Sequence, residues 1–391
     1  MKKIFADFIF DGYTIRHKSA LVVNEEGVIL EILDEDKFHA KEAEYYPGLI
    51  CPGFVNAHGH LELSHLKSKM PTGTGLLAFL RGVVTLRDID QSIIDEAIRL
   101  ADSEMWSEGI VAAGDISNKM DTIITKQNSK IKYYTFVEAF DLWQPAMADS
   151  FFETYKKVYD QYGDLPKSMS PHAPYSVSPD LFLRINELNN ENSIISIHNQ
   201  EVQDEDLMFL DKSGGFISFI ENFGFSMNHF SPIEKTSIHY SMKQLKPTSK
   251  QLWVHNTMMQ SEDIMSAMQW NPNSYFVTCP NANLYIENRL PNYQNLIDRK
   301  AKLCVGTDSL SSNWRLSILE ELKTIQKYQS YIPIEEVLQW STLNGAEALG
   351  MDDWAGSFEL NKKPGILWIQ NFKKLNDQYL FEDDARVSRL F

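Results

Sequence analysis

The chain has 391 residues, of which 43% are hydrophobic and 23% are charged, and its formal net charge is −16. This composition is typical of a soluble globular protein and is too apolar for intrinsic disorder. The acidic balance argues against a protein that binds nucleic acid or an anionic membrane, because phosphate contacts need clustered lysine and arginine. At this length, one large α/β domain or two domains are expected.

The first segment, MKKIFADFIFDGYTIRHK, is interrupted by Asp7 and Asp11. It therefore predicts a strand, because a signal peptide needs a longer uncharged core. No run of about 18 apolar residues occurs in the sequence, so no membrane span is expected. Cys51, Cys279 and Cys304 are far apart and odd in number. We therefore expect no disulfide framework and a cytoplasmic location.

Both ends of the chain predict β-structure, with antiparallel strands in residues 1–50. Residues 1–50 alternate apolar and polar positions, with a turn at Gly27. The C-terminal stretch GSFELNKKPGILWIQNF has the same character, with a turn at Gly365. We expect residues 1–50 and 355–391 to pair in space into one small β-sandwich domain.

The middle of the chain, residues 51–354, alternates short apolar runs with amphipathic segments of helical spacing. Such alternation favours α/β structure, here a closed (β/α)8 TIM-like barrel rather than an open sheet. Ser178 followed by Pro179 predicts the start of one helix. The least regular zone, residues 202–250, lengthens one connection. The predicted barrel strands cover residues 51–58, 110–116, 131–139, 168–172, 193–198, 252–255, 274–279 and 302–308.

Three histidines lie close together in the stretch PGFVNAHGHLELSHL. His58 and His60 are two positions apart at the end of a predicted strand, so both imidazoles point to the same side and can bind one ion. His-x-His alone is a weak signal for a metal. His65 is out of phase with this pair, and we interpret it as a loop or substrate-rim residue.

Polar residues also end three later strands. His198 ends the run SIISIH, His255 ends QLWVH and Asp308 ends KLCVGTD. In a parallel barrel these strand ends form one rim, where active sites are built. Burying such groups separately would cost free energy, whereas a shared partner would satisfy them together. With His58 and His60, they predict a metal centre; the alternative is a set of unrelated polar residues.

These motifs, and their order along the chain, resemble those of the amidohydrolase superfamily. The segments PGFVNAHGHLE, SPHAPYSVSPDL, IHNQE, CPNANLYI and VGTDSLSSN are similar to its cytosine deaminase and chlorohydrolase-like branch. The resemblance implies a (β/α)8 barrel with a small β-sandwich formed by both termini. Within the branch, the motifs are most similar to those of aminodeoxyfutalosine deaminases of menaquinone biosynthesis.

The resemblance also implies a metal site. His58, His60, His198 and Asp308 would hold one divalent ion, with His255 in hydrogen-bond reach of its water. Imidazole and carboxylate ligands suit Zn²⁺, and Fe²⁺ is the alternative. In binuclear relatives, a lysine near the end of the fourth strand bridges two ions. The corresponding segment here, SMSPHAPYS, has no lysine, which favours a single ion.

Glu201 follows His198 in the segment HNQE, as in deaminase-like members of the branch. A carboxyl beside a metal-bound water can protonate a ring nitrogen and carry protons to a leaving amine. Glu201, His255 and Asp308 are therefore the predicted catalytic residues. The alternative for Glu201 is a solvated loop glutamate close to Glu205.

Further residues lie near the predicted rim. Arg81 and Arg87, in LLAFLRGVVTLRD, could bind an anionic group, but we interpret them as solvated charges on a helix face. The predicted substrate contacts are His172, Glu138, Glu62 and Ser64. The alternatives are a supporting or packing role for His172, pairing with a rim cation for Glu138, and packing or turn roles for the other two residues.

Together these patterns predict a metal-dependent aminohydrolase that deaminates an amino-substituted heterocycle, such as the adenine-nucleoside-like 6-aminodeoxyfutalosine. The alternatives are a deaminase of S-adenosylhomocysteine or guanine, a triazine-type chlorohydrolase and an imidazolonepropionase-like hydrolase of a cyclic amide. A non-catalytic scaffold is less consistent, because such proteins usually lose metal ligands. The expected partner is a small-molecule substrate, with neither nucleic acid nor membrane, and the chain could form a homodimer.

Overall fold

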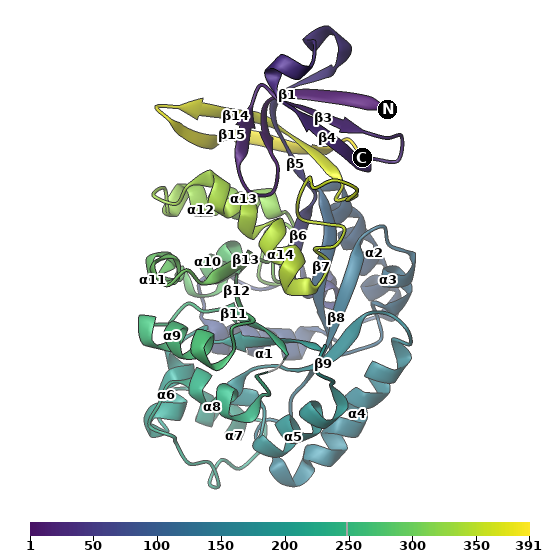
Figure 1. The fold of residues 1–391 in the computed structure, drawn as a ribbon. Helices are drawn as coiled ribbons and strands as arrows, with labels where there is room; N and C mark the ends of the chain where they lie inside the picture. Colours follow the sequence, from purple (N-terminus) through teal and green to yellow (C-terminus); the bar gives the residue numbers. More distant parts are fainter. Residues whose placement is uncertain (248) are drawn as a thin grey trace.

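The computed structural model describes residues 1–247 and 249–391 (Figure 1). Its central feature is a set of eight parallel strands in two four-stranded sheets, ordered β6-β7-β8-β9 and β10-β11-β12-β13. The strands are β6 (Phe54–Gly59), β7 (Ile110–Ser117), β8 (Lys132–Ala139), β9 (Lys167–Pro171), β10 (Ile194–Asn199), β11 (Lys250–His255), β12 (Ser274–Thr278) and β13 (Lys302–Val305).

Backbone hydrogen bonds join the two sheets at both seams. At one seam, the amide of His198 donates to the carbonyl of His172 at 2.9 Å. At the other, the amides of Thr307 and Asp308 both donate to the carbonyl of His58 at 3.0 Å. The eight strands therefore close into a barrel, which confirms the predicted α/β fold class.

Helices follow the strands and pack around them (Figure 1). The predicted helix start at Ser178 is correct, because its side chain accepts a hydrogen bond from the amide of Leu181, with Pro179 at the first helical position. The helices are α1 (Leu76–Leu86), α2 (Gln91–Ser107), α3 (Ile123–Asn128), α4 (Ala148–Gln161), α5 (Pro179–Leu188), α6 (Gln203–Asp211), α7 (Phe216–Glu221), α8 (Ser237–Gln244), α9 (Ser261–Trp270), α10 (Pro280–Glu287), α11 (Tyr293–Asp298), α12 (Ile318–Tyr328), α13 (Ile334–Trp340) and α14 (Leu343–Leu349). Short 3₁₀ turns are η1 (Glu35–Lys37), η2 (Ala40–Glu42), η3 (Leu61–Leu66), η4 (Pro145–Met147) and η5 (Pro174–Ser176).

Strands from both termini form one seven-stranded sheet, ordered β15-β14-β5-β1-β3-β4 with β2 paired to β1. In Figure 1 the yellow C-terminal strands lie beside the purple N-terminal ones, because β14 pairs with β5. The pairing of β1 with β5 is parallel, so the N-terminal part is mixed and not purely antiparallel as expected. The predicted domain boundaries at residues 50 and 355 stay a prediction. The strands are β1 (Lys2–Phe10), β2 (Ile15–His17), β3 (Ala20–Val23), β4 (Ile29–Leu33), β5 (Glu44–Pro52), β14 (Ile366–Leu375) and β15 (Gln378–Arg389).

Two expected elements differ from the structure. The single strand expected over residues 51–58 is divided at Gly53, because β5 continues to Pro52 in the terminal sheet and β6 begins at Phe54. The zone 202–250, expected to be irregular, contains the three helices α6, α7 and α8 within its described residues.

In the described part of the chain, the helices are all too short or too polar to cross a membrane. The three cysteines are buried and free.

Gly53 provides the first testable prediction, because it joins the terminal sheet to the barrel. A Cβ atom there would lie 2.4 Å from Cγ1 of Val111 and 2.5 Å from the carbonyl oxygen of Pro364. We expect Gly53→Ala to lower the free energy of unfolding by about 1–3 kcal/mol, as overpacking does. Urea unfolding checks this, and an unchanged midpoint would contradict the close packing described.

Candidate active site

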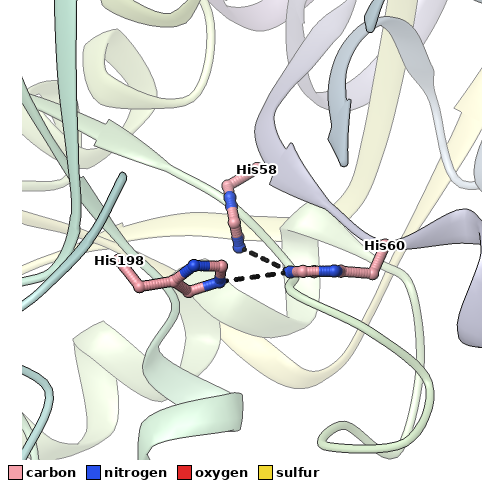
Figure 2. A group of neighbouring side chains, drawn as sticks. All are labelled: His58, His60 and His198. Carbon is pink, nitrogen blue, oxygen red and sulfur yellow. Dashed lines mark hydrogen bonds between the residues drawn. The ribbon is translucent and has the colours of Figure 1, made fainter. Parts of the chain in front are cut away.

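Three histidine side chains converge at the carboxyl ends of the strands. His58 lies in β6, His60 follows that strand directly, and His198 lies in β10. The Nε2 atom of His60 is 3.1 Å from Nε2 of His58 and 3.3 Å from Nε2 of His198. Figure 2 shows the three rings pointing toward one another, although His198 is far from the other two in sequence.

Asp308 completes this group from the last strand end. Its Oδ1 atom is 3.3 Å from Nε2 of His60 and 3.6 Å from Nε2 of His58. Four tetrahedral ligands, each about 2.1 Å from a zinc ion, would be separated from one another by about 3.4 Å. The four side chains therefore fit the ligand set of one divalent ion.

The protonation of these groups also fits an ion. The Nδ1 atom of His198 donates to the carbonyl of His172 at 2.9 Å, which leaves a lone pair on its Nε2. Burial lowers the pKa of His60 to about 3, so that ring is neutral. Burial alone would raise the pKa of Asp308, but the imidazole of His58, 3.6 Å away, and the rings of His60 and His255 hold it well below its usual range. Buried imidazole lone pairs that face the Asp308 carboxylate are costly without a partner, and a bound cation would stabilise them together.

A second group of possible ligands, Glu138, His172 and His198, lies beside the first. A second ion there would need the Nδ1 atom of His198, which already donates to the His172 carbonyl. One oxygen of Glu138 also accepts a hydrogen bond from the side chain of Asn118 at 2.9 Å. The geometry therefore favours one ion at His58, His60, His198 and Asp308.

Glu201 and His255 face each other next to this group. Oε1 of Glu201 is 3.7 Å from Nε2 of His255, while Nδ1 of His255 donates to Oδ1 of Asn283 at 2.8 Å. Glu201 is buried, so the alternative of a solvated loop glutamate is wrong. Burial raises the pKa of Glu201 well above its usual value, and the charge of Asp308 adds to the effect.

The backbone around these side chains has an uncommon conformation. His255 has φ of 71° and Asp308 has φ of 54°, in the left-handed region that side chains other than glycine rarely adopt. Such strain is tolerated where surrounding contacts enforce it and is frequent at active sites. Gln200 also has a positive φ, of 44°, and the buried carboxyl group of Glu205 fixes this turn after β10 by accepting hydrogen bonds from the amides of Gln200 and Glu201.

A cavity of about 350 Å³ opens in front of the converging side chains. Its floor includes His60, His198, Glu201, His255 and Asp308. This volume lies within the range of small-molecule sites. The predicted metal and catalytic residues thus share one cavity, apart from His58, which lies behind it and is fully buried.

The predicted substrate contacts divide into two pairs. His172 and Glu138 line the cavity, and Oε1 of Glu138 has no hydrogen-bond partner among the described residues. Glu62 and Ser64 are not among the described residues that line it. Ser64 donates to the carbonyl of Leu61 within η3, which fits the alternative of a turn residue, and its predicted substrate contact stays a prediction.

Arg87 differs from its predicted role as a solvated helix-face charge. It lines the cavity, and its Nη2 atom donates to Oε1 of Glu62 at 3.1 Å. The other oxygen of Glu62 accepts from the amides of Asn118 and Lys119. Glu62 therefore holds the cavity wall together, and its predicted contact with substrate stays a prediction. His65 supports the same wall, because its Nε2 atom donates to the carbonyl of Arg87 at 3.0 Å.

A buried ion pair next to the histidines was not predicted. Oδ2 of Asp115 lies 2.6 Å from Nζ of Lys126, and Oδ1 accepts from the amide of Leu61, directly after His60. Both side chains are almost fully buried. The aspartate ends the apolar run IVAAGD, and this local signal could have indicated it. Lys126 and Asn283, the partners of Asp115 and His255, do not end an apolar run, so no local sequence pattern indicates them.

The chain matches the amidohydrolase family over residues 49–386, and it therefore belongs to that family. This confirms the family and the hydrolytic enzyme predicted from the motifs. The chain is 27% identical over 337 residues to an adenosine deaminase of Helicobacter pylori, covering 84% of this chain and 80% of the relative. An aminodeoxyfutalosine deaminase of Nitratiruptor sp. is 26% identical over 349 residues, covering 85% of this chain and 82% of the relative.

Among solved structures, the fold is similar to Helicobacter pylori aminofutalosine deaminase in complex with methylthio-coformycin. The TM-score is 0.81 at 24% sequence identity, and the match covers 96% of this chain and 94% of that chain. This likeness shows that the two proteins share the fold.

The buried ion pair leads to a prediction about stability. Lys126→Met would leave the Asp115 carboxylate buried without its partner, which should lower the free energy of unfolding by about 3–5 kcal/mol. Adding Asp115→Asn removes that unpaired charge, so the double variant should recover part of the loss. Urea unfolding of both variants checks this, and equal losses in the single and double variants would contradict the pairing.

Proposed function

We propose that this protein is a metal-dependent deaminase of an adenine-like nucleoside. The observation that carries the proposal is the buried Glu201 carboxyl, 3.7 Å from Nε2 of His255 at the edge of the four-ligand group. Relatives that are adenosine and aminodeoxyfutalosine deaminases support the adenine-like class. In the overall reaction, water replaces the exocyclic amine, a carbon–oxygen bond forms, the carbon–nitrogen bond breaks and ammonia leaves.

We assign one divalent ion to His58, His60, His198 and Asp308, with Zn²⁺ favoured by the ligand types and Fe²⁺ as the alternative. When bound, such an ion activates water for attack on the ring carbon. The Nδ1 atoms of His198 and His255 donate to protein oxygens, so their Nε2 atoms face the cavity as acceptors. Ser312 donates to Oδ2 of Asp308 at 2.6 Å and so orients the carboxylate.

Glu201 moves the protons in this proposal. Because burial raises its pKa, the carboxyl is protonated when it meets the ring and can donate to the ring nitrogen beside the amine-bearing carbon. His255 accepts a proton from water through Nε2, since burial lowers its pKa and keeps the ring neutral. Glu201, now a carboxylate, takes the proton of the new hydroxyl and delivers it to the departing amine. The proton held by His255 then restores the Glu201 carboxyl, 3.7 Å away.

The substrate is held by polar groups above the floor. His172 and Glu138 line the cavity, and burial raises the pKa of Glu138 to about 7. Its unpartnered oxygen is a suitable contact for a hydroxyl or amine of the substrate. Among named compounds we favour 6-aminodeoxyfutalosine, an intermediate of menaquinone biosynthesis, over guanine, triazines and cyclic amides. A cytoplasmic location and a homodimer stay predictions.

The assignment of Glu201 is tested by Glu201→Gln. This variant should keep its bound metal, while ammonia release from adenine nucleosides should fall about 100-fold or more, because an amide cannot shuttle the proton. The matched control is Glu191→Gln, which changes an exposed glutamate. A Glu201→Gln enzyme that retains both metal and full turnover would disprove the role.

A further inference from the structure

Two of the metal-site histidines depend on the main chain for their position. In His198, the ring nitrogen Nδ1 donates to the carbonyl of His172, and this bond orients the ring. Among the described residues, Nδ1 of His58 and Nδ1 of His60 have no hydrogen-bond partner. Histidines that bind metals usually have their ring fixed by such a bond. The positions of the His58 and His60 rings are therefore determined by the contacts that hold their backbone.

On one side, the backbone of β6 is attached to the last strand end of the barrel. The amides of Thr307 and Asp308 donate to the carbonyl of His58. The side chain of Asn56 accepts from the amide of Thr307 at 3.0 Å and donates to its hydroxyl at 2.8 Å. These contacts fix the backbone of His58, but they involve no main-chain group of His60.

On the other side, Asp115 of β7 holds the peptide bond that follows His60. Its Oδ1 atom accepts a hydrogen bond from the amide of Leu61 at 2.8 Å. Leu61 is buried, and its amide has no other acceptor among the described residues. The carbonyl of His60 accepts from the amide of Leu63 at 3.1 Å, so both polar groups of this peptide bond are engaged. The bond to Asp115 therefore fixes the end of His60 that the contacts with Thr307 and Asp308 leave free.

Lys126 of α3 keeps the Asp115 carboxylate in one orientation. Its Nζ atom lies 2.6 Å from Oδ2 of Asp115, 3.0 Å from Oγ1 of Thr135 and 3.2 Å from Oγ of Ser117. An ammonium group has three donors, and here each of them can meet one oxygen. Replacing a buried ion pair by an apolar pair of similar shape is often neutral for stability. The place of this pair directly beside the metal ligands therefore points to a role other than stability.

We propose that Asp115 is a positioning residue for the metal centre, which acts through the amide of Leu61 to hold His60 in its ligand position. The inference rests on the metal ion assigned under the proposed function, but it does not depend on which substrate reacts. Without Asp115, the amide of Leu61 would be buried without a partner, which is costly. The peptide bond would then rotate toward another acceptor or water, and the imidazole of His60 would move with it.

The test compares two double variants in which both charges of the pair are absent. Asp115→Asn with Lys126→Met keeps an acceptor for the amide of Leu61, and the new side-chain nitrogen would replace Oδ2, 3.5 Å from Oγ of Ser117. Asp115→Val with Lys126→Met has a similar shape but no acceptor. We expect the dissociation constant for Zn²⁺, measured by competition with a chelator, to stay close to the wild-type value in the first variant. In the second it should rise about 10–100-fold, as when the supporting partners of metal ligands are removed.

Two further measurements separate this role from a general loss of stability. Circular dichroism should show that both double variants remain folded. With Co²⁺ in place of Zn²⁺, the visible absorption spectrum should match that of the wild-type protein for Asp115→Asn with Lys126→Met. The spectrum should differ for Asp115→Val with Lys126→Met, because displacement of His60 changes the ligand set. If that variant does not fold, Asp115→Ala with Lys126→Met takes its place in the same comparison.

Equal Zn²⁺ affinities of the two double variants would overturn the inference, whether both match the wild-type protein or both are weakened. A wild-type protein that does not bind Zn²⁺ would overturn the metal assignment and this inference together. The expected difference in affinity, with no ammonia released from adenine nucleosides by the Zn²⁺-loaded wild-type protein, would support the role of Asp115 and reject the proposed deamination.

Discussion

The seam between the first and last barrel strands determines the rest of the site. The carbonyl of His58 accepts hydrogen bonds from the amides of Thr307 and Asp308, each at 3.0 Å. Gly306 makes this approach possible, since a Cβ atom there would lie 2.8 Å from the His58 carbonyl oxygen. The same contacts that close the barrel therefore bring the Asp308 carboxylate against His58 and His60, and closure and metal-site geometry depend on each other.

The cavity above this seam combines two environments with different physical roles. Its floor gathers lone pairs and carboxyl groups whose pKa values are shifted by burial, as expected where proton transfer is catalysed. Its outer part, between α1 and α7, is mainly apolar, and among the described residues that line it the charged groups Arg87 and Asp88 are paired. In the proposed function, the floor carries out the reaction and the outer part contacts the rest of the substrate. The helix α7 of this outer part belongs to the zone 202–250, which lengthens the connection after β10.

The sequence predicts those features that have a local pattern. The strands β10 and β11 were located to within about two residues, because continuous apolar runs ending in histidine mark buried barrel strands. The change of sheet at Gly53 could not be predicted, since the run ICPGFV remains apolar through both strands. The helices of the zone 202–250 were missed because they are short, and α7 has only six residues.

For the site residues, too, the sequence predicts only what a local pattern marks. Strand ends predicted which histidines and which aspartate would meet, because parallel strands share one rim. The pairing of Arg87 with Glu62 and of Lys126 with Asp115 depends on contacts between separate elements, and neither spacing nor periodicity encodes such contacts. The left-handed backbone at His255 is likewise imposed by its surroundings, since histidine does not prefer that conformation.

The most direct test of this account is the metal content of the purified protein and of three histidine variants, measured by inductively coupled plasma mass spectrometry. The wild-type protein should contain one divalent transition metal ion per chain. His65→Ala should keep that ion, because His65 contacts the carbonyl of Arg87 and not the ligand group. His58→Ala and His60→Ala should each lose it while remaining folded by circular dichroism. Full metal content in both of these variants would contradict the account.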